Sequence, residues 1–203
     1  MVRRLFVPAL ILLMGGAALA TQAEVGGALP AFESRLGQYV EMHRRLEGPL
    51  PPLMVTSNFD ELHRLMATLR ERIRAERKDQ RQGWLLPPPM VALLRARVQS
   101  CLTNDEIADT MELIEEHTPP NMPRVRVNEA LPEDAPFGLI PPQALAALPK
   151  LPPELRYVVL SKALVIWDHH ADLVVDIAPG VFDATTYRKT SQLTRSCPTP
   201  RFS

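Results

Sequence analysis

Three short apolar runs near the C-terminal end, separated by very short turns, restrict the fold more than any other feature of the chain. They cover Leu155 to Leu160, Ala163 to Asp168 and Leu173 to Ile177, and they are rich in Val, Ile and Leu. The turns Ser161-Lys162 and His169-His170-Ala171 can join only antiparallel neighbours, because a parallel crossover needs about a dozen residues or more. Residues 154–178 are therefore predicted to form a three-stranded antiparallel meander.

The part of the chain before this meander carries apolar residues at helical spacing. Within residues 30–117 the pattern predicts four helices, and Gly48-Pro49 ends the first of them. Ser57 is the predicted N-cap of the second helix, and Thr103, Asn104 or Asp105 caps the fourth. A small sheet must bury its apolar face against another layer. We therefore expect an α+β fold, with four helices followed by a small three-stranded antiparallel sheet packed on them.

Proline is abundant, with 21 residues, while glycine is scarce, with 9. Consecutive prolines exclude helix and favour extended chain. Residues 118–153 are accordingly predicted to be a proline-rich connector with one helical turn at Pro142 to Leu148. The connector also carries apolar side chains, so we expect an extended arm that wraps the helical body rather than plain disorder.

Both ends of the chain differ from the middle in composition. Arg3 and Arg4 precede the apolar run from Leu5 to Met14, and Ala18-Leu19-Ala20 is a site of the type that signal peptidase cleaves. Residues 1–20 are predicted to be a signal peptide, with cleavage after Ala23 as the second choice. Residues 183–203 are polar and aperiodic and are predicted to be a flexible tail.

The charged residues and the cysteines limit which partners and which cellular compartment are expected. Two of the 23 basic residues lie in the predicted signal peptide, which leaves 21 against 23 acidic residues and argues against a nucleic-acid partner. No second long apolar stretch follows, so no membrane span is expected after cleavage. In an oxidising periplasm Cys101 and Cys197 can form a disulfide. The alternative is a buried Cys101 and a free Cys197 in the tail.

The turn between the last two strands offers candidate metal ligands. Asp168, His169, His170 and Asp172 supply imidazole and carboxylate groups suited to Zn, Ni, Co or Cu. Adjacent residues on a strand point to opposite faces, which counts against a single site. The alternative is a polar hairpin turn whose side chains bind backbone groups.

Enzyme signatures are absent from the sequence. It contains no Gly-x-Ser-x-Gly elbow, no His-Glu-x-x-His motif and no glycine-rich phosphate loop. Ser100 beside Cys101 has no neighbouring base, and His43, His63 and His117 are interpreted as polar residues at helix edges or ends. We expect no catalytic site and no cofactor.

Charge patterning suggests a different role. The second predicted helix is rich in arginine, whereas the fourth carries only acidic charges. Arg70, Arg74 and Arg77 are candidate contacts for a protein partner or an anionic component of the envelope. The alternative is a solvated helix face whose ion pairs contribute little.

Two resemblances add to this interpretation. The run from Leu155 to Ile177, with LVIWD and LVVDI on either side of a short turn, resembles the closing hairpin of periplasmic nickel and cobalt efflux-regulator proteins. The layout of YVEMHRRLEGPLPP, a capped charged helix, LPPELRYVVL and LVIWDHHADLVVDIAP resembles a group of uncharacterised exported bacterial proteins over residues 39–179. These resemblances imply export, with a role as an accessory or interaction protein, or alternatively in metal binding or sensing.

Overall fold

The computed structural model describes residues 16–52, 58–118, 124–132, 135, 140–160 and 162–182, with side chains from residue 26 onward. Most of the predicted signal peptide and the whole predicted tail, 183–203, lie outside these residues. Ser57 and Cys197 lie outside them as well. Export, the mobility of the tail and the disulfide therefore stay predictions.

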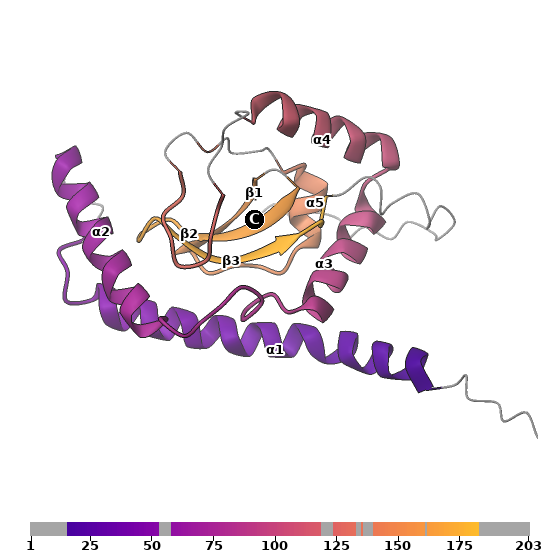
Figure 1. Ribbon diagram of the computed structural model, residues 1–203, viewed down its shortest axis with the longest axis horizontal. Helices are drawn as coiled ribbons and strands as arrows, with labels where there is room; N and C mark the ends of the chain where they lie inside the picture. Colours follow the sequence, from indigo (N-terminus) through magenta and orange to yellow (C-terminus); the bar gives the residue numbers. More distant parts are fainter. Residues whose placement is uncertain are drawn as a thin grey trace, which may run out of the picture.

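The predicted meander is present as a three-stranded antiparallel sheet in the order β1-β2-β3 (Figure 1). Its strands are β1 (Leu155–Leu160), β2 (Ala163–Asp168) and β3 (Leu173–Pro179), and β3 ends two residues beyond its predicted end. The register shifts once, because Ile166 pairs with Asp176 while Trp167 pairs with Val174. This bulge leaves Val175 as the extra residue of β3.

Helices precede the sheet, which confirms the α+β prediction. They are α1 (Gly16–Glu47), α2 (Phe59–Glu76), α3 (Pro88–Cys101), α4 (Asn104–His117) and the short α5 (Pro142–Ala147). The predicted cap of α2 is wrong by one residue: Asn58 accepts from the backbone N–H groups of Asp60 and Glu61. Thr103 caps α4, and its reciprocal bonds with Glu106 form a capping box.

Helix α1 begins earlier than its apolar stripe predicts. It runs through Pro30 and continues back across the predicted cleavage site to Gly16. Figure 1 shows it as a long rod along one side of the molecule. Among its described side chains, Ala28, Phe32, Leu36, Tyr39 and Val40 are buried against the rest of the protein.

Each face of the sheet has its own cover. Alternate residues of the strands, such as Val159, Leu164 and Val175, join the main core with α1 to α5. The opposite face, with Val158, Val165 and Val174, packs against the connector instead. That second cluster consists of Leu131, Ala135, Val158, Leu160, Val165 and Val174.

The connector covers this second sheet face with Leu131 and Ala135, while Ala144 and Leu148, further along it, join the main core with the helices. The backbone N–H of Asn128 donates to Val174 O at 2.9 Å, and Val174 N–H donates to Glu129 O at 2.9 Å. Both faces of the sheet are apolar, so the face that the helices leave open requires a second apolar layer.

A buried carboxylate on β3 holds the loop between α2 and α3. Asp176 accepts hydrogen bonds from the backbone N–H groups of Gly83, Leu85 and Leu86 at 2.7 to 2.9 Å. Gly83 has a φ of +87°, a conformation that L side chains rarely adopt. Within the described part of the chain, no helix is both long enough and apolar enough to span a membrane.

Candidate metal site between α1 and the β2–β3 turn

Three polar side chains follow one another along the C-terminal half of α1. Tyr39, His43 and Glu47 are four residues apart, a spacing that places them on one face of the helix. That face meets the end of β2 and the turn that follows it. The helix therefore presents a phenol, an imidazole and a carboxylate to one short segment of the sheet.

His43 is fully buried and lies between two carboxylates. Its Nδ1 donates to Asp168 Oδ2 at 2.6 Å, and its Nε2 donates to Glu47 Oε2 at 3.0 Å. Ionised carboxylates only accept, so a protonated His43 can donate to both of them. Burial opposes this charge, but the hydrogen bond and charge of Asp168, followed by those of Glu47, outweigh it and raise the pKa of His43.

Asp168 organises both sides of the site. Its Oδ2 also accepts from the hydroxyl of Tyr39 at 2.6 Å. Its Oδ1 accepts from the backbone N–H groups of His170 and Ala171 at 3.1 and 3.0 Å. Burial, together with the neighbouring Asp168 charge, raises the pKa of Tyr39 well above its usual value, so the phenol remains a donor. One buried carboxylate thus fixes the turn and orients His43.

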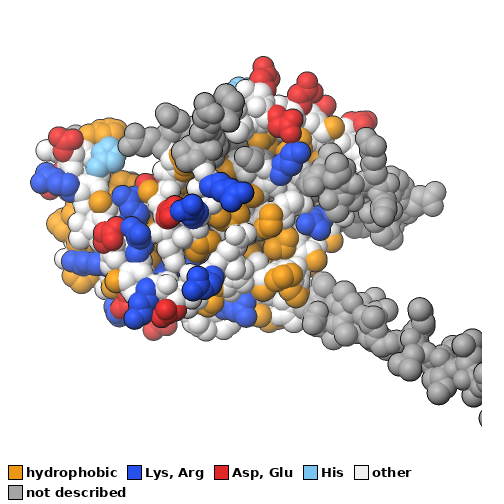
Figure 2. All heavy atoms as spheres, in the orientation of Figure 1, with side chains coloured by type: hydrophobic (Ala, Val, Ile, Leu, Met, Phe, Trp, Pro, Cys, Tyr) orange, Lys and Arg blue, Asp and Glu red, His pale blue; other side chains and the backbone are white. Residues whose placement is uncertain are grey.

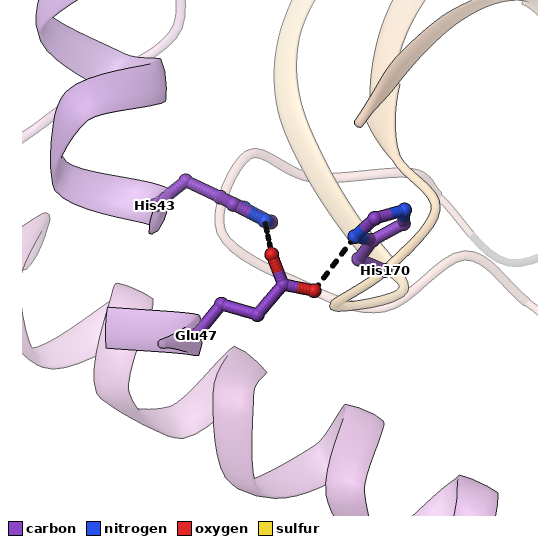
Figure 3. Close-up of side chains that lie close together, drawn as sticks. All are labelled: His43, Glu47 and His170. Atoms are coloured by element: carbon purple, nitrogen blue, oxygen red, sulfur yellow. Dashed lines mark hydrogen bonds and ion pairs between the residues drawn. The ribbon is translucent and has the colours of Figure 1, made fainter. Parts of the chain in front are cut away.

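Figure 3 shows Glu47 lying between the two imidazoles. Its second oxygen, Oε1, accepts from His170 Nδ1 at 2.8 Å. The ring centroids of His43 and His170 are 5.6 Å apart. One ligand atom from each of His43, Glu47 and His170 lies within 4.8 Å of the other two.

This arrangement of two imidazoles and one carboxylate matches the ligands of zinc sites that keep an open position. Zinc bonds of about 2.0 to 2.2 Å place tetrahedral ligand atoms roughly 3.3 to 3.6 Å apart. A metal would therefore lengthen the N···O contacts of 3.0 and 2.8 Å and replace the hydrogens that His43 Nε2 and His170 Nδ1 donate to Glu47. Glu47 and His170 are 25% and 26% exposed, which leaves both side chains room to rotate. In many metal sites a carboxylate binds the second nitrogen of a ligand histidine and orients its ring. Asp168, which contacts His43 Nδ1, is placed to do the same.

The four ligands predicted from the turn do not converge. His170 points toward α1, while Asp168 binds His43 and the turn backbone. His169 Nε2 instead donates to Pro153 O at 2.7 Å. Asp172 accepts from Arg70 NH1 at 2.8 Å and from the Trp167 indole at 3.2 Å. Asp168 and His169 bind backbone groups, as expected for a polar hairpin turn without a metal. Of the four predicted ligands, His170 alone belongs to the cluster with His43 and Glu47.

The three arginines predicted to contact a partner have different environments. Arg77 is buried: its guanidinium donates to Asn128 Oδ1 and Val175 O, and it lies 5.0 Å from the centroid of the Tyr39 ring. Arg70 is partly buried against the β2–β3 turn. Only Arg74 is exposed, where it pairs with Glu71 at 2.9 Å. Two of the three therefore serve internal contacts.

The predicted disulfide partner Cys101 is the last residue of α3 and is partly buried. Figure 2 shows acidic side chains gathered over α4 at the top of the molecule and mixed charges over α1 and α2. In Figure 1, α2 lies at the left of the molecule and α4 at its upper right. The Arg-rich and the acidic helix therefore do not pair with each other across this face.

Two residues of the cluster, His43 and Glu47, were not among the predicted ligands. The signal for His43 was its position on the apolar stripe of α1, next to Tyr39 and Val40, because a polar residue on a buried stripe needs a partner. Glu47 lies one helical turn further on. Neither position reveals from sequence that the partner is a turn more than 120 positions away.

Comparisons of the chain with protein-family models, with curated proteins and with solved structures find no match. The two resemblances noted in the sequence therefore stay predictions. What can be said of function rests on the side chains that α1 and the β2–β3 turn bring together.

Proposed function

We propose that this chain is an exported, periplasmic accessory protein that binds one divalent transition-metal ion through His43, Glu47 and His170. The observation that carries the proposal is the convergence of three ligand atoms within 4.8 Å from two elements far apart in sequence. Two imidazole nitrogens and one carboxylate oxygen suit Zn, Ni, Co and Cu. Mg and Ca are disfavoured because they require oxygen ligands.

The hydrogen bonds around the cluster support this proposal. Asp168 holds His43 by Nδ1, so the ring presents Nε2 to Glu47. A metal-bound histidine usually has such a second partner, which fixes its tautomer and orientation. Tyr39 and two backbone N–H groups fix Asp168 in turn. Only Glu47 and His170 would then have to change position when the ion binds.

Titration of the purified protein with Zn²⁺, followed by calorimetry and native mass spectrometry, tests the site. We expect one ion per chain at micromolar concentration, and at least a roughly tenfold weaker affinity for His170→Gln and Glu47→Gln. His169→Gln is the matched control, since its imidazole is adjacent in sequence but donates to Pro153 O. Asp172→Asn is a second control on the same turn.

The alternatives give different outcomes. Loss of binding in His169→Gln and Asp172→Asn, with His170→Gln binding normally, would support a site within the turn and reject the one between α1 and the turn. No Zn²⁺, Ni²⁺ or Co²⁺ binding at micromolar concentration would reject metal binding and leave the cluster as a buried ion pair.

Export has its own test. Expression in a bacterium with a periplasm should release a chain that begins at Thr21, or at Glu24 if cleavage follows Ala23. An intact mass about 2 Da below that of the reduced chain would establish the bond between Cys101 and Cys197. Recovery of the uncleaved chain from the cytoplasm alone would contradict the proposal of export.

Partner binding through Arg70, Arg74 and Arg77 is the second candidate, and the structure narrows how it can be tested. Arg70 and Arg77 make internal contacts, so only Arg74 is exposed for a partner. Arg74→Glu should weaken capture of a protein partner or an anionic envelope component from a periplasmic extract. Unchanged capture by Arg74→Glu would reject this mode of binding.

A further inference from the structure

The cluster of His43, Glu47 and His170 is closed on one side and open on the other. His43 is fully buried, whereas Glu47 and His170 are each about a quarter exposed. Zinc and cobalt in such sites take four or five ligands, and three protein ligands leave at least one position unfilled. Because Glu47 and His170 are the partly exposed ligands, a ligand from solution would approach the metal from their side.

Helix α2 places two guanidinium groups beside these two ligands. Arg72 NH1 donates to the carbonyl oxygen of Leu46 at 3.1 Å, one residue before Glu47. Arg70 NH1 donates to Ala171 O at 3.4 Å and to Asp172 Oδ2 at 2.8 Å, just after His170. Arg72 therefore binds the backbone next to Glu47, and Arg70 binds the turn just after His170.

Arg72 adds positive charge near the loaded site. A divalent ion bound by two neutral imidazoles and the Glu47 carboxylate would have a net charge of plus one, which the Asp168 carboxylate on His43 offsets. Asp172 offsets the charge of Arg70, whereas Arg72 donates to the neutral carbonyl of Leu46, a contact that does not compensate its charge. A negatively charged ligand at the open position would be stabilised by both the metal and Arg72.

We propose that the metal held by His43, Glu47 and His170 takes a small oxyanion from solution, a carboxylate or a phosphate, as its exogenous ligand, with Arg72 beside it. This inference rests on the proposed metal binding. It adds to that function a ligand class: the protein would bind the anion only when the metal is present. In the anion's absence, water would fill the position.

Cobalt provides separate measurements for the two steps. Co²⁺ binding is measured first by equilibrium dialysis and by the appearance of visible absorption bands. Acetate and inorganic phosphate are then added separately to the loaded protein, with dialysis confirming that Co²⁺ stays bound. We expect a saturable change in the absorption bands, because replacing a water ligand alters the field at the metal. The relative affinities for acetate and phosphate show which oxyanion is preferred.

Variants of α2 identify the role of Arg72. Arg72→Gln should weaken anion binding roughly threefold to tenfold with little change in Co²⁺ affinity, and Arg72→Lys should retain part of the effect. Arg74→Gln, an exposed arginine on the same helix, is the control and should bind the anion normally.

The failures are distinguishable. Absence of Co²⁺ binding rejects the metal function and this inference with it. Co²⁺ binding with a spectrum that neither anion alters rejects the inference alone. An equal loss of anion affinity in Arg72→Gln and Arg74→Gln also overturns it, because the effect would then come from general charge.

Discussion

His43 Nδ1 lies 2.6 Å from Asp168 Oδ2, and both side chains are fully buried. The contact joins α1 to the end of β2 across 125 positions of sequence. Desolvation of two charged groups is costly, and the additional bonds from Tyr39, Glu47 and the turn backbone offset that cost. The pair therefore couples the orientation of α1 to the shape of the β2–β3 turn.

Asp168→Asn should lower the free energy of unfolding by roughly 2–4 kcal/mol, because it removes the buried carboxylate that accepts from His43, Tyr39 and the turn backbone. Urea denaturation followed by circular dichroism measures the loss. Glu71→Gln, an exposed carboxylate on α2, is the control and should change stability by less than about 0.5 kcal/mol. Equal stability of Asp168→Asn and the wild type would show that the buried pair contributes nothing.

Asp176→Asn should destabilise the protein by roughly 1–3 kcal/mol, because the new amide group would face backbone N–H donors. The effect should be greatest in the loop between α2 and α3. Hydrogen exchange at the amides of Gly83, Leu85 and Leu86 measures it. Exchange there at the wild-type rate would contradict the assigned role of this carboxylate.

Arg77→Glu should lower stability by roughly 3–5 kcal/mol, because it places a carboxylate against Val175 O and between the rings of Tyr39 and Trp84. Arg74→Glu, three residues earlier on the same helix and exposed, should change it by about 0.5 kcal/mol or less. Thermal unfolding of the two variants separates these outcomes. Similar melting temperatures would mean that Arg77 is not held as described.

Alkaline pH should destabilise the fold in part through Tyr157. Burial raises the pKa of Tyr157, whose hydroxyl donates to Pro149 O at 3.0 Å. The folded state then keeps a proton that the unfolded chain releases above its pKa of about 10, so stability falls as pH rises beyond that value. Tyr157→Phe should show a shallower fall between about pH 9.5 and 11 in urea titrations. An identical slope in both proteins would exclude a contribution from this phenol.

The sheet and most helices were predictable because local patterns determine them. The runs at β1 and β2 gave the observed strand limits, since apolar strands joined by connections of two and four residues can pair only as antiparallel neighbours. The extension of α1 back through Pro30 was not predicted, because the apolar stripe was recognised only from Phe32 onward. The position of the connector on the second sheet face depended on which face the helices left uncovered.

The sequence by itself determined the α+β class, the antiparallel meander and the stripe that places Tyr39, His43 and Glu47 on one helix face. Periodicity specifies which residues share a face, because the backbone repeats at 3.6 or 2 residues. Only the tertiary structure decided that this face contacts Asp168 and His170. It also decided that His169 binds Pro153 O and that Asp172 binds Arg70. The docking of a helix end against a distant turn is set by the packing of the whole core, and no local pattern records it.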